Sequence, residues 1–411
     1  MNNKDKYFLL NGTSNPSSKF LNNFIQKGYD NEGNLIDESD VNYIDLKSGM
    51  WNININPQLL KNDVLNVMKT LIEKNNYFSD IQSVSNPIFN IVAEKLNILL
   101  NDKTKTTNYK IIFSNSGSES NEIALKFVNA MYRTTNLLAF DMSYHGATAN
   151  ASLVSGIDSK NKIKGKNINF INFPTCLEEE EASLQQIRIL LEDLSIGAFI
   201  IEPVLASAGV YMASKNYYSN LHSLLKEKNI IIIFDEVATG FYRTGTPFYF
   251  HQLDIEPDII TMSKAINNGI IPFGAVAVNE DIFNKVNKAS LEHFMTQNGN
   301  LLGLHTANIV LDYYIEHGEE LSENVINIHK VTNEILDGAL EYRNIGAMLA
   351  IPTGPNNPLE VMQSLQRFGI ITYIYINSTS QGISIFPMLT MSIEKYTSTL
   401  KFIKRQLEKL C

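Results

Sequence analysis

The sequence predicts an α/β fold, in which a large domain with a mostly parallel sheet is joined to a smaller α+β domain. Two apolar runs of the 411-residue chain, at 198–204 and 230–237, are continuous, which suits strands buried on both faces of a parallel sheet. The segment between them, 216–228, has the leucine spacing of an amphipathic helix. Strands that alternate with helices along the chain are typical of this fold class.

The other expected elements follow from the same patterns. We expect further strands of the large sheet at 109–115, 136–141, 258–262 and 274–278, with a helix at 119–131. Further helices are expected at 59–74, 87–100, 306–316, 319–342 and 392–410, the last with Ser392 as N-cap. Strands at 345–351 and 371–376 suit a smaller domain. The expected division is an N-terminal segment (1–58) that packs with the small domain, a large domain (59–305) and a small domain (306–411).

Composition and charge restrict the class of protein. A net charge of −9 argues against binding to nucleic acid or to an anionic membrane. We expect no membrane span, because no run of about 18 apolar residues occurs, and no signal peptide, because residues 1–18 lack an apolar core. The two cysteines, Cys176 and Cys411, form no CxxC pair, and no metal-ligand cluster is expected. A cytoplasmic location is the simplest interpretation.

Two charged residues follow buried strands. Asp235 ends the run IIIIF, and Lys264 follows the expected strand 258–262. Ligands of open α/β sheets bind at the carboxyl ends of strands, so both side chains could reach one cleft. An isolated aspartate at such a place caps the next element about as often as it meets a ligand. A buried lysine without a partner is costly, whereas a lysine that forms a Schiff base avoids that cost.

Two further segments allow a functional or an ordinary explanation. Ser116, Gly117 and Ser118 lie between a strand and a helix, where backbone N–H groups can bind a phosphate. Ser116 and Glu119 also fit a capping box, which needs no ligand. Tyr144, after another strand, could stack on a planar cofactor, although most of the 18 tyrosines are expected to pack in the core or on loops.

Taken together and in order, these segments resemble the class III aminotransferases, which use pyridoxal 5′-phosphate (PLP). The likeness runs from about residue 40 to 315 and continues weakly to about 395. The segments that carry it are YIDLKSGMWN, NSGSESNEIALK, SYHG, IIEPV, FDEVATGFYRTG, PDIITMSKAINNGIIPFGAV and TQNGNLLGLHTANIVLD, in which Leu301 stands where the family usually has proline.

The resemblance implies the aspartate-aminotransferase-like, PLP-dependent transferase fold, working as a homodimer with shared sites. It implies that Lys264 is the Schiff-base lysine and that Asp235 pairs with the pyridine nitrogen, so that the ring can accept electrons. The other cofactor-binding residues that it implies are Gly117 and Ser118 for the phosphate, Thr296 for the phosphate of the other subunit, Val237 and Tyr144 for the two ring faces, and Glu202 of the E-P pair.

On the substrate side, the resemblance implies roles for Trp51, Tyr144 and Arg243, although Arg243 could equally be structural. Glu122 is expected to support the site from behind. Two departures concern the substrate carboxylate. Ser384 stands where many members carry an arginine that clamps the α-carboxylate, and Ser207 stands where ornithine-type members carry the glutamate that holds this arginine aside.

The sequence therefore predicts an aminotransferase that moves an amino group between an amine or amino acid and a keto acid. Without the clamp, 2-oxoglutarate is expected to be a poor acceptor and pyruvate-like acids better ones, unless Arg243 or a lysine or arginine of a loop or of the second subunit has taken over the task. An aminomutase or racemase is the alternative within PLP chemistry, and the pair Asn121–Glu122 favours the aminotransferase. A non-catalytic scaffold of the same fold is the alternative of another class, against which Lys264, Asp235 and Thr296 argue.

Overall fold

The structure is a computed structural model that describes residues 26–77, 86–101, 107–132, 136–157, 167–193, 195–253, 255–287 and 293–409. The expectations for residues 1–18 and for Cys411 lie outside these residues. No helix in the described part of the chain is long and apolar enough to cross a membrane.

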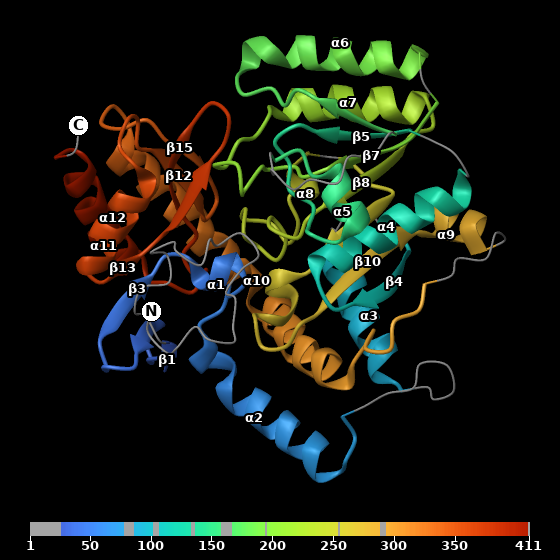
Figure 1. Ribbon diagram of the computed structural model, residues 1–411. Helices are drawn as coiled ribbons and strands as arrows, with labels where there is room; N and C mark the ends of the chain where they lie inside the picture. The colour runs from blue at the N-terminus through green and yellow to red at the C-terminus, as the bar shows by residue number, and fades with distance from the viewer. Residues whose placement is uncertain are drawn as a thin grey trace, which may run out of the picture.

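A seven-stranded sheet forms the centre of the larger part of the molecule (Figure 1). The strand order is β4-β10-β9-β8-β7-β5-β6. Strands β6, β5, β7, β8 and β9 run parallel, and β10 runs antiparallel to both β9 and β4. This confirms the α/β class with a mostly parallel sheet. The strands are β4 (Tyr109–Ser114), β5 (Asn136–Phe140), β6 (Ile168–Ile171), β7 (Ile196–Ile201), β8 (Ile231–Asp235), β9 (Ile259–Met262) and β10 (Gly274–Asn279).

Helices cover both faces of this sheet, which explains the continuous apolar runs. In β8, Ile231 and Ile233 pack in one cluster with α4 (Gly117–Met131), whereas Ile232 packs in another with α7 (Lys215–Glu227). Successive side chains of a strand point to opposite faces, so α4 and α7 lie on opposite sides of the sheet. Helix α6 (Leu177–Asp193) lies beside α7 (Figure 1).

The smaller part holds two four-stranded sheets. One has the order β11-β12-β15-β14, from β11 (Arg343–Ile345), β12 (Met348–Pro352), β14 (Tyr373–Ile376) and β15 (Gln381–Ile385). The other joins β1 (Gln26–Tyr29), β2 (Asn34–Asp37) and β3 (Asn42–Asp45) to β13 (Ile370–Ile371). Because β3 pairs in parallel with β13, the N-terminal segment is hydrogen-bonded to a strand more than 300 residues later. Helices α11 (Pro358–Arg367) and α12 (Ile393–Leu407) pack beside these strands, and Ser392 caps α12.

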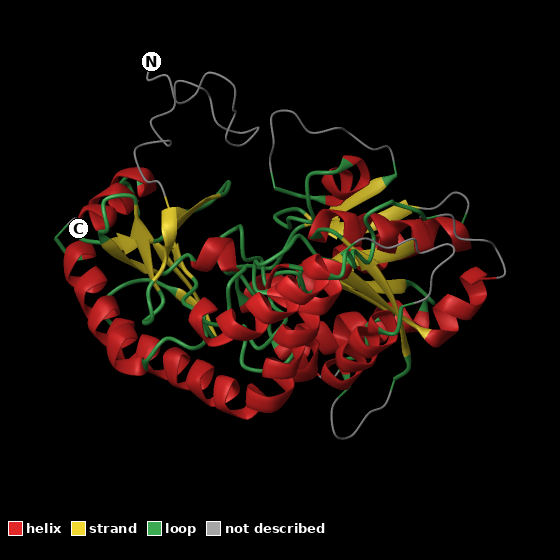
Figure 2. Cartoon of the chain, turned by 90° about the horizontal axis from the view of Figure 1, so that it is seen from below, coloured by secondary structure: helices red, strands yellow, loops and turns green. Residues whose placement is uncertain are grey.

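A single long helix, α10 (Leu301–Leu336), replaces the two helices expected at 306–316 and 319–342, and the boundary expected near residue 305 falls inside it. The gap expected between those two helices includes Gly318. The structure shows another reason for a glycine there, since a Cβ at this position would collide with the hydroxyl group of Tyr242. The helix packs on α3 (Ile88–Leu100) of the larger part and on α12 of the smaller part, and Figure 2 shows helices lying along the strands of both parts.

The remaining described elements are short or lie near the N-terminal segment. They are α1 (Ser48–Trp51), α2 (Pro57–Glu73), α3 (Ile88–Leu100), α5 (Ala149–Val154), α8 (Phe250–Leu253), the 3₁₀ helix η3 (Lys264–Asn267) and α9 (Glu280–Asn287). Helix α1 is an irregular turn rather than a regular helix, because Gly49 and Met50 have left-handed backbone angles. This turn carries Trp51 into the molecule.

Candidate active site

The carboxyl ends of the strands bring most of the predicted site residues to one edge of the large sheet. Asp235 is the last residue of β8, Glu202 follows β7, and Lys264 follows β9. These strands are parallel neighbours, so their carboxyl ends lie side by side. Tyr144 and His145 follow β5 at the same edge.

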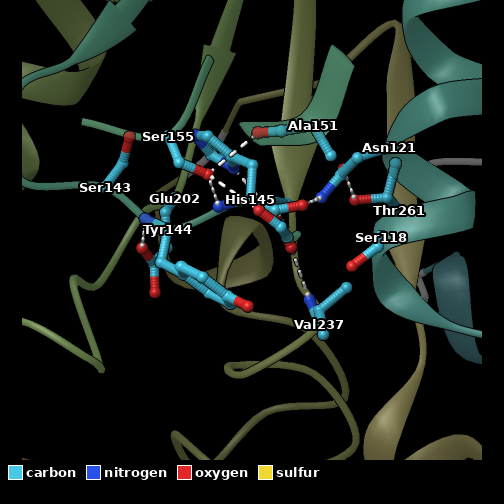
Figure 3. A network of polar contacts seen from close by, with 12 residues as sticks. Ser118, Asn121, Ser143, Tyr144, His145, Ala151, Ser155, Glu202, Val237 and Thr261 are labelled. Carbon is cyan, nitrogen blue, oxygen red and sulfur yellow. Dashed lines mark hydrogen bonds and ion pairs between the residues drawn. The ribbon is translucent and has the colours of Figure 1, made fainter. Parts of the chain in front are cut away.

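Asp235 is the centre of a buried hydrogen-bond network (Figure 3). Its Oδ2 accepts a hydrogen bond of 2.8 Å from the side-chain amide of Asn121 and lies 2.8 Å from Nδ1 of His145. Its Oδ1 accepts from the backbone N–H of Val237 at 3.1 Å. Asn121 is itself held by Thr261, whose hydroxyl donates to its amide oxygen at 2.8 Å. The carboxylate is therefore fixed in direction.

Lys264 begins η3 with a positive φ of 41°, a strained conformation for a side-chain-bearing residue. Burial lowers the pKa of its amine, while the carboxylates of Asp235 and Glu202 act in the opposite direction. The amine lies 5.2 Å from the ring centroid of Trp51. A strand-end lysine whose neutral form is favoured is suited to nucleophilic and proton-transfer chemistry.

Glu202 anchors the loops around the site through both carboxylate oxygens. Oε2 accepts from the backbone N–H of Tyr144 at 2.9 Å, and Oε1 accepts from that of Ala206 at 3.1 Å. Burial and the nearby Asp235 raise the pKa of Glu202 to about 8. Tyr144, which Glu202 holds by its backbone, leaves 44% of its surface exposed, so the ring is accessible to a ligand.

The start of α4 confirms the expected capping interaction. Ser116 accepts from the backbone N–H of Glu119 at 3.2 Å, while the Glu119 carboxylate accepts from that of Asn115 at 3.1 Å. A Cβ on Gly117 would lie 2.9 Å from Val237, so only glycine lets the two segments approach so closely. Ser118 accepts from the backbone N–H of Ala147 at 3.1 Å and stays partly exposed.

Glu122 and Thr296 lie at the margin of this arrangement. Glu122 accepts from the backbone N–H groups of Asn150 and Ala151, at 2.8 and 3.2 Å, and so holds the first turn of α5. Thr296 is exposed on the turn before α10, and its side chain makes no hydrogen bond within the described part of the chain. The structure thus brings Asp235, Lys264 and Glu202 together and leaves Thr296 apart, at the surface.

Trp51 comes from α1 and forms one wall of the site. Its buried ring packs against Phe386 and Tyr373, with ring centroids 4.3 and 5.0 Å apart. Its Nε1 has no hydrogen-bond partner among the described residues. This places residues of the N-terminal segment and of β14 next to Lys264.

Arg243 is completely buried and is occupied by protein groups. Its Nη1 donates to the backbone oxygens of Pro387 and Ala347, at 2.6 and 3.2 Å, and its Nη2 donates to the side-chain oxygen of Asn54. Burial lowers the pKa of Arg243 to about 10. These contacts tie the N-terminal segment, the large sheet and the small domain together, which favours the structural role over the substrate contact.

Comparison with known proteins identifies the family. The profile of the family described as "Aminotransferase class-III" matches residues 14–407. The chain belongs to the class III aminotransferases. It is 30% identical to the acetylornithine aminotransferase of Lactococcus lactis over 364 residues, which cover 87% of this chain and 90% of that protein.

Solved structures of transaminases share the fold. The thermostable omega transaminase of Pseudomonas jessenii, as a fourfold mutant, superposes with a TM-score of 0.86 at 21% identity and covers 99% of this chain and 98% of its own. The taurine:2-oxoglutarate aminotransferase of Bifidobacterium kashiwanohense, solved with PLP and glutamate, gives 0.82 at 22% identity and covers 94% of each chain. The predicted family, PLP-dependent transferase fold, enzyme class and PLP cofactor are thereby confirmed.

The residues at this edge of the sheet fit the cofactor of a class III aminotransferase. PLP has a pyridine nitrogen, an aldehyde and a phosphate. The oriented carboxylate of Asp235, the amine of Lys264 and the start of α4 beside Gly117 offer a matching partner for each. The contact that only a glycine at position 117 permits is the geometric feature that supports this fit most directly.

Sequence reasoning left out the residues that orient Asp235. Asn121 was considered only as a family marker, His145 only as the neighbour of Tyr144, and Thr261 not at all. The signal available was position, since Thr261 lies three residues before Lys264 in β9 and Asn121 lies on the first turns of α4. The positions of Asn121 and Thr261 in the sequence do not reveal that the Asn121 amide contacts Asp235. That contact follows only from the pairing of the strands and the packing of α4 on them.

A structural role for Arg243 makes a testable prediction. Arg243→Lys should lower the urea midpoint of unfolding by an amount equivalent to about 2 kcal/mol, because an ammonium group cannot replace three hydrogen bonds of a buried guanidinium. The exposed substitution Arg405→Lys is the control and should leave the midpoint unchanged. An unchanged midpoint in Arg243→Lys, with a raised KM for carboxylate substrates, would instead support substrate binding.

Proposed function

We propose that this aminotransferase acts on amines whose carboxylate lies away from the reacting carbon, and that it uses a pyruvate-like keto acid as acceptor. One observation carries the proposal. Ser384, at the place of the expected clamp, is buried in β15 with no hydrogen-bond partner for its hydroxyl group in the described part of the chain. Arg243, the nearest candidate by sequence, donates to protein oxygens. An α-carboxylate would therefore lack an arginine fork here.

The proposed roles of the site residues follow from their geometry. Bound PLP supplies an electron sink for the bond that breaks at the substrate carbon. Asp235, held by Asn121 and His145, would accept a hydrogen bond from the protonated ring nitrogen and so keep the proton on the ring, because the buried carboxylate favours that charged pair. Lys264 would bind the cofactor and then carry the proton at the reacting carbon, a task for which its lowered pKa is suited.

The remaining contacts would fix the position of the cofactor. We assign the backbone N–H groups of Gly117 and Ser118 to the phosphate, at the N-terminus of α4. Val237 and Tyr144 would cover the two faces of the ring, with Glu202 holding the Tyr144 backbone in place. Trp51 would border the substrate.

We also propose that the enzyme is a homodimer with shared sites and is located in the cytoplasm. Thr296 is exposed directly after the apolar residues Phe294 and Met295, which are 57% and 45% exposed. A second subunit that covers them would bring Thr296 to the phosphate bound by that second subunit. The exposed free thiol of Cys176 suits a reducing compartment.

The role of Lys264 predicts a specific chemical label. Borohydride reduction of the holoenzyme, followed by peptide mapping, should place the cofactor on Lys264, because its amine is the nucleophile at the strand ends. Lys264→Ala should lose both label and turnover, whereas the surface control Lys401→Ala should keep both. A label on any other lysine would defeat the assignment.

The missing fork predicts the order of amino donors. The value of kcat/KM for 5-aminovalerate should exceed that for glutamate by roughly 10- to 150-fold, the cost of losing one charge-assisted contact to the α-carboxylate. Single-turnover loss of the cofactor absorbance band measures this directly. Glutamate as the best donor would show that an α-carboxylate clamp exists elsewhere.

A site shared between two subunits predicts how a substitution at Thr296 changes PLP binding. Thr296→Val should weaken PLP binding without changing the sedimentation coefficient of a dimer, because the residue would contact the partner's phosphate rather than its own fold. Thr379→Val, also exposed but in the small domain, serves as the matched control. Full activity in a monomer would overturn the shared site and the role of Thr296 together.

A further inference from the structure

Lys47 is a half-buried cation without an acidic partner. It precedes Ser48 at the start of α1, and burial lowers the pKa of its amine while Asp45 raises it. No carboxylate lies within 4 Å of this amine in the described part of the chain; Asp45 instead accepts from backbone N–H groups and from Tyr29. Asp45 acts on this amine only from a distance, and a partly desolvated ammonium group with no anion in contact is costly, so an anionic ligand would find a favourable partner here.

The position of Lys47 relates it to the reacting amine. Its Nζ lies 5.8 Å from the ring centroid of Tyr373, and that ring packs edge-on against Trp51 at 5.0 Å. The amine of Lys264 lies 5.2 Å from the centroid of the Trp51 ring. The two amines therefore lie beside one pair of aromatic rings, each near a different ring.

Two buried donors without partners belong to or adjoin the same pair of rings. Ser384 is the register partner of Tyr373 across β15 and β14, so their side chains project from the same face of the sheet. Phe386, two residues further on, packs against Trp51 at 4.3 Å. Within the described residues, neither the hydroxyl group of Ser384 nor Nε1 of Trp51 has a hydrogen-bond partner.

Other cations near the smaller sheet are committed to the protein. Arg343 stacks on Tyr211, with 4.0 Å between its guanidinium carbon and the ring centroid, and donates to the backbone oxygen of Gly209 and to the hydroxyl group of Tyr375. Arg243 is held as described above. Lys47 is thus the described cation beside the Trp51–Tyr373 pair that lacks an assigned partner, apart from the reacting lysine itself.

We propose that Lys47, with the hydroxyl group of Ser384 and the indole N–H of Trp51, binds the carboxylate that the substrate carries away from its reacting amine. The inference rests on the proposed function and names the residue that sets its specificity. A carboxylate accepts several hydrogen bonds, and its negative charge would pair with the ammonium group of Lys47. A lysine is a point charge without a fixed fork, so it tolerates carboxylates that arrive at different angles.

Ligand binding tests this subsite without any reaction. Glutarate has a carboxylate at each end but neither an amine nor a keto group, and Trp51, the only tryptophan of the chain, reports occupancy by its fluorescence. For the holoenzyme we expect saturable binding of glutarate by calorimetry, together with a change in Trp51 emission. Lys47→Met should weaken binding roughly tenfold or more, and Lys47→Arg should retain it.

Lys401→Met is the matched control for this binding experiment. Lys401→Met replaces an exposed lysine of α12 and should bind glutarate as the wild type does. Failure of the wild type to bind glutarate, or an equal Kd in Lys47→Met, would overturn the subsite.

Two donors of equal chain length test the same inference in the reaction. 5-Aminovalerate carries a distal carboxylate, and pentylamine lacks it. In Lys47→Met the loss of kcat/KM should be at least about tenfold larger for 5-aminovalerate than for pentylamine, and residual use of 2-oxoglutarate, whose distal carboxylate could reach the same amine, should also fall. Equal losses for both donors would overturn the role of Lys47. A wild type that uses neither donor would overturn the proposed function, while glutarate binding still decides the subsite.

Discussion

The need to satisfy a buried carboxylate at the end of β8 constrains much of the surrounding structure. Asp235 is removed from water, so its oxygens require donors, and these come from α4, from the turn after β5 and from its own chain two residues on. Each donor is in turn fixed, Asn121 by Thr261 and the backbone of His145 by Ser155. The mutual positions of the ends of β5, β8 and β9 are thus set by polar contacts as well as by the apolar core, and a ring nitrogen would meet an acceptor whose direction is already fixed.

The sequence predicted best those features that depend on a single strand or helix. A continuous apolar run predicts a buried parallel strand, and a strand end predicts where its polar residue emerges, so Asp235 and Lys264 could be expected at one edge before the strands were paired. Short antiparallel strands gave weaker signals. The segment expected as one strand at 345–351 is a hairpin, β11 and β12, which turns at Gly346 with a φ of 53°.

Contacts between distant segments could not be foreseen. Trp51, Tyr373 and Ser384 become neighbours only because β3 pairs with β13 and β14 pairs with β15, two registers that no local pattern specifies. The same holds for Arg243, whose partners Asn54 and Pro387 are separated from it by 189 and 144 positions. The sequence around Arg243 was thus compatible with either a substrate contact or a structural role. Only the tertiary structure distinguishes the two.

The continuity of α10 also matters for anyone who exchanges parts between related enzymes. A helix of 36 residues spans about 54 Å, and it packs on α3 beneath the large sheet and on α12 in the smaller part. A chimaera joined near residue 305 would cut the helix just after its first turn, so that helix segments from two different parents would have to match. Gly338, which follows the helix with a φ of 69° and has open space where a Cβ would stand, is the better junction. Strands β14 and β15 could then be transplanted as a unit, with the helix left intact as the shared frame.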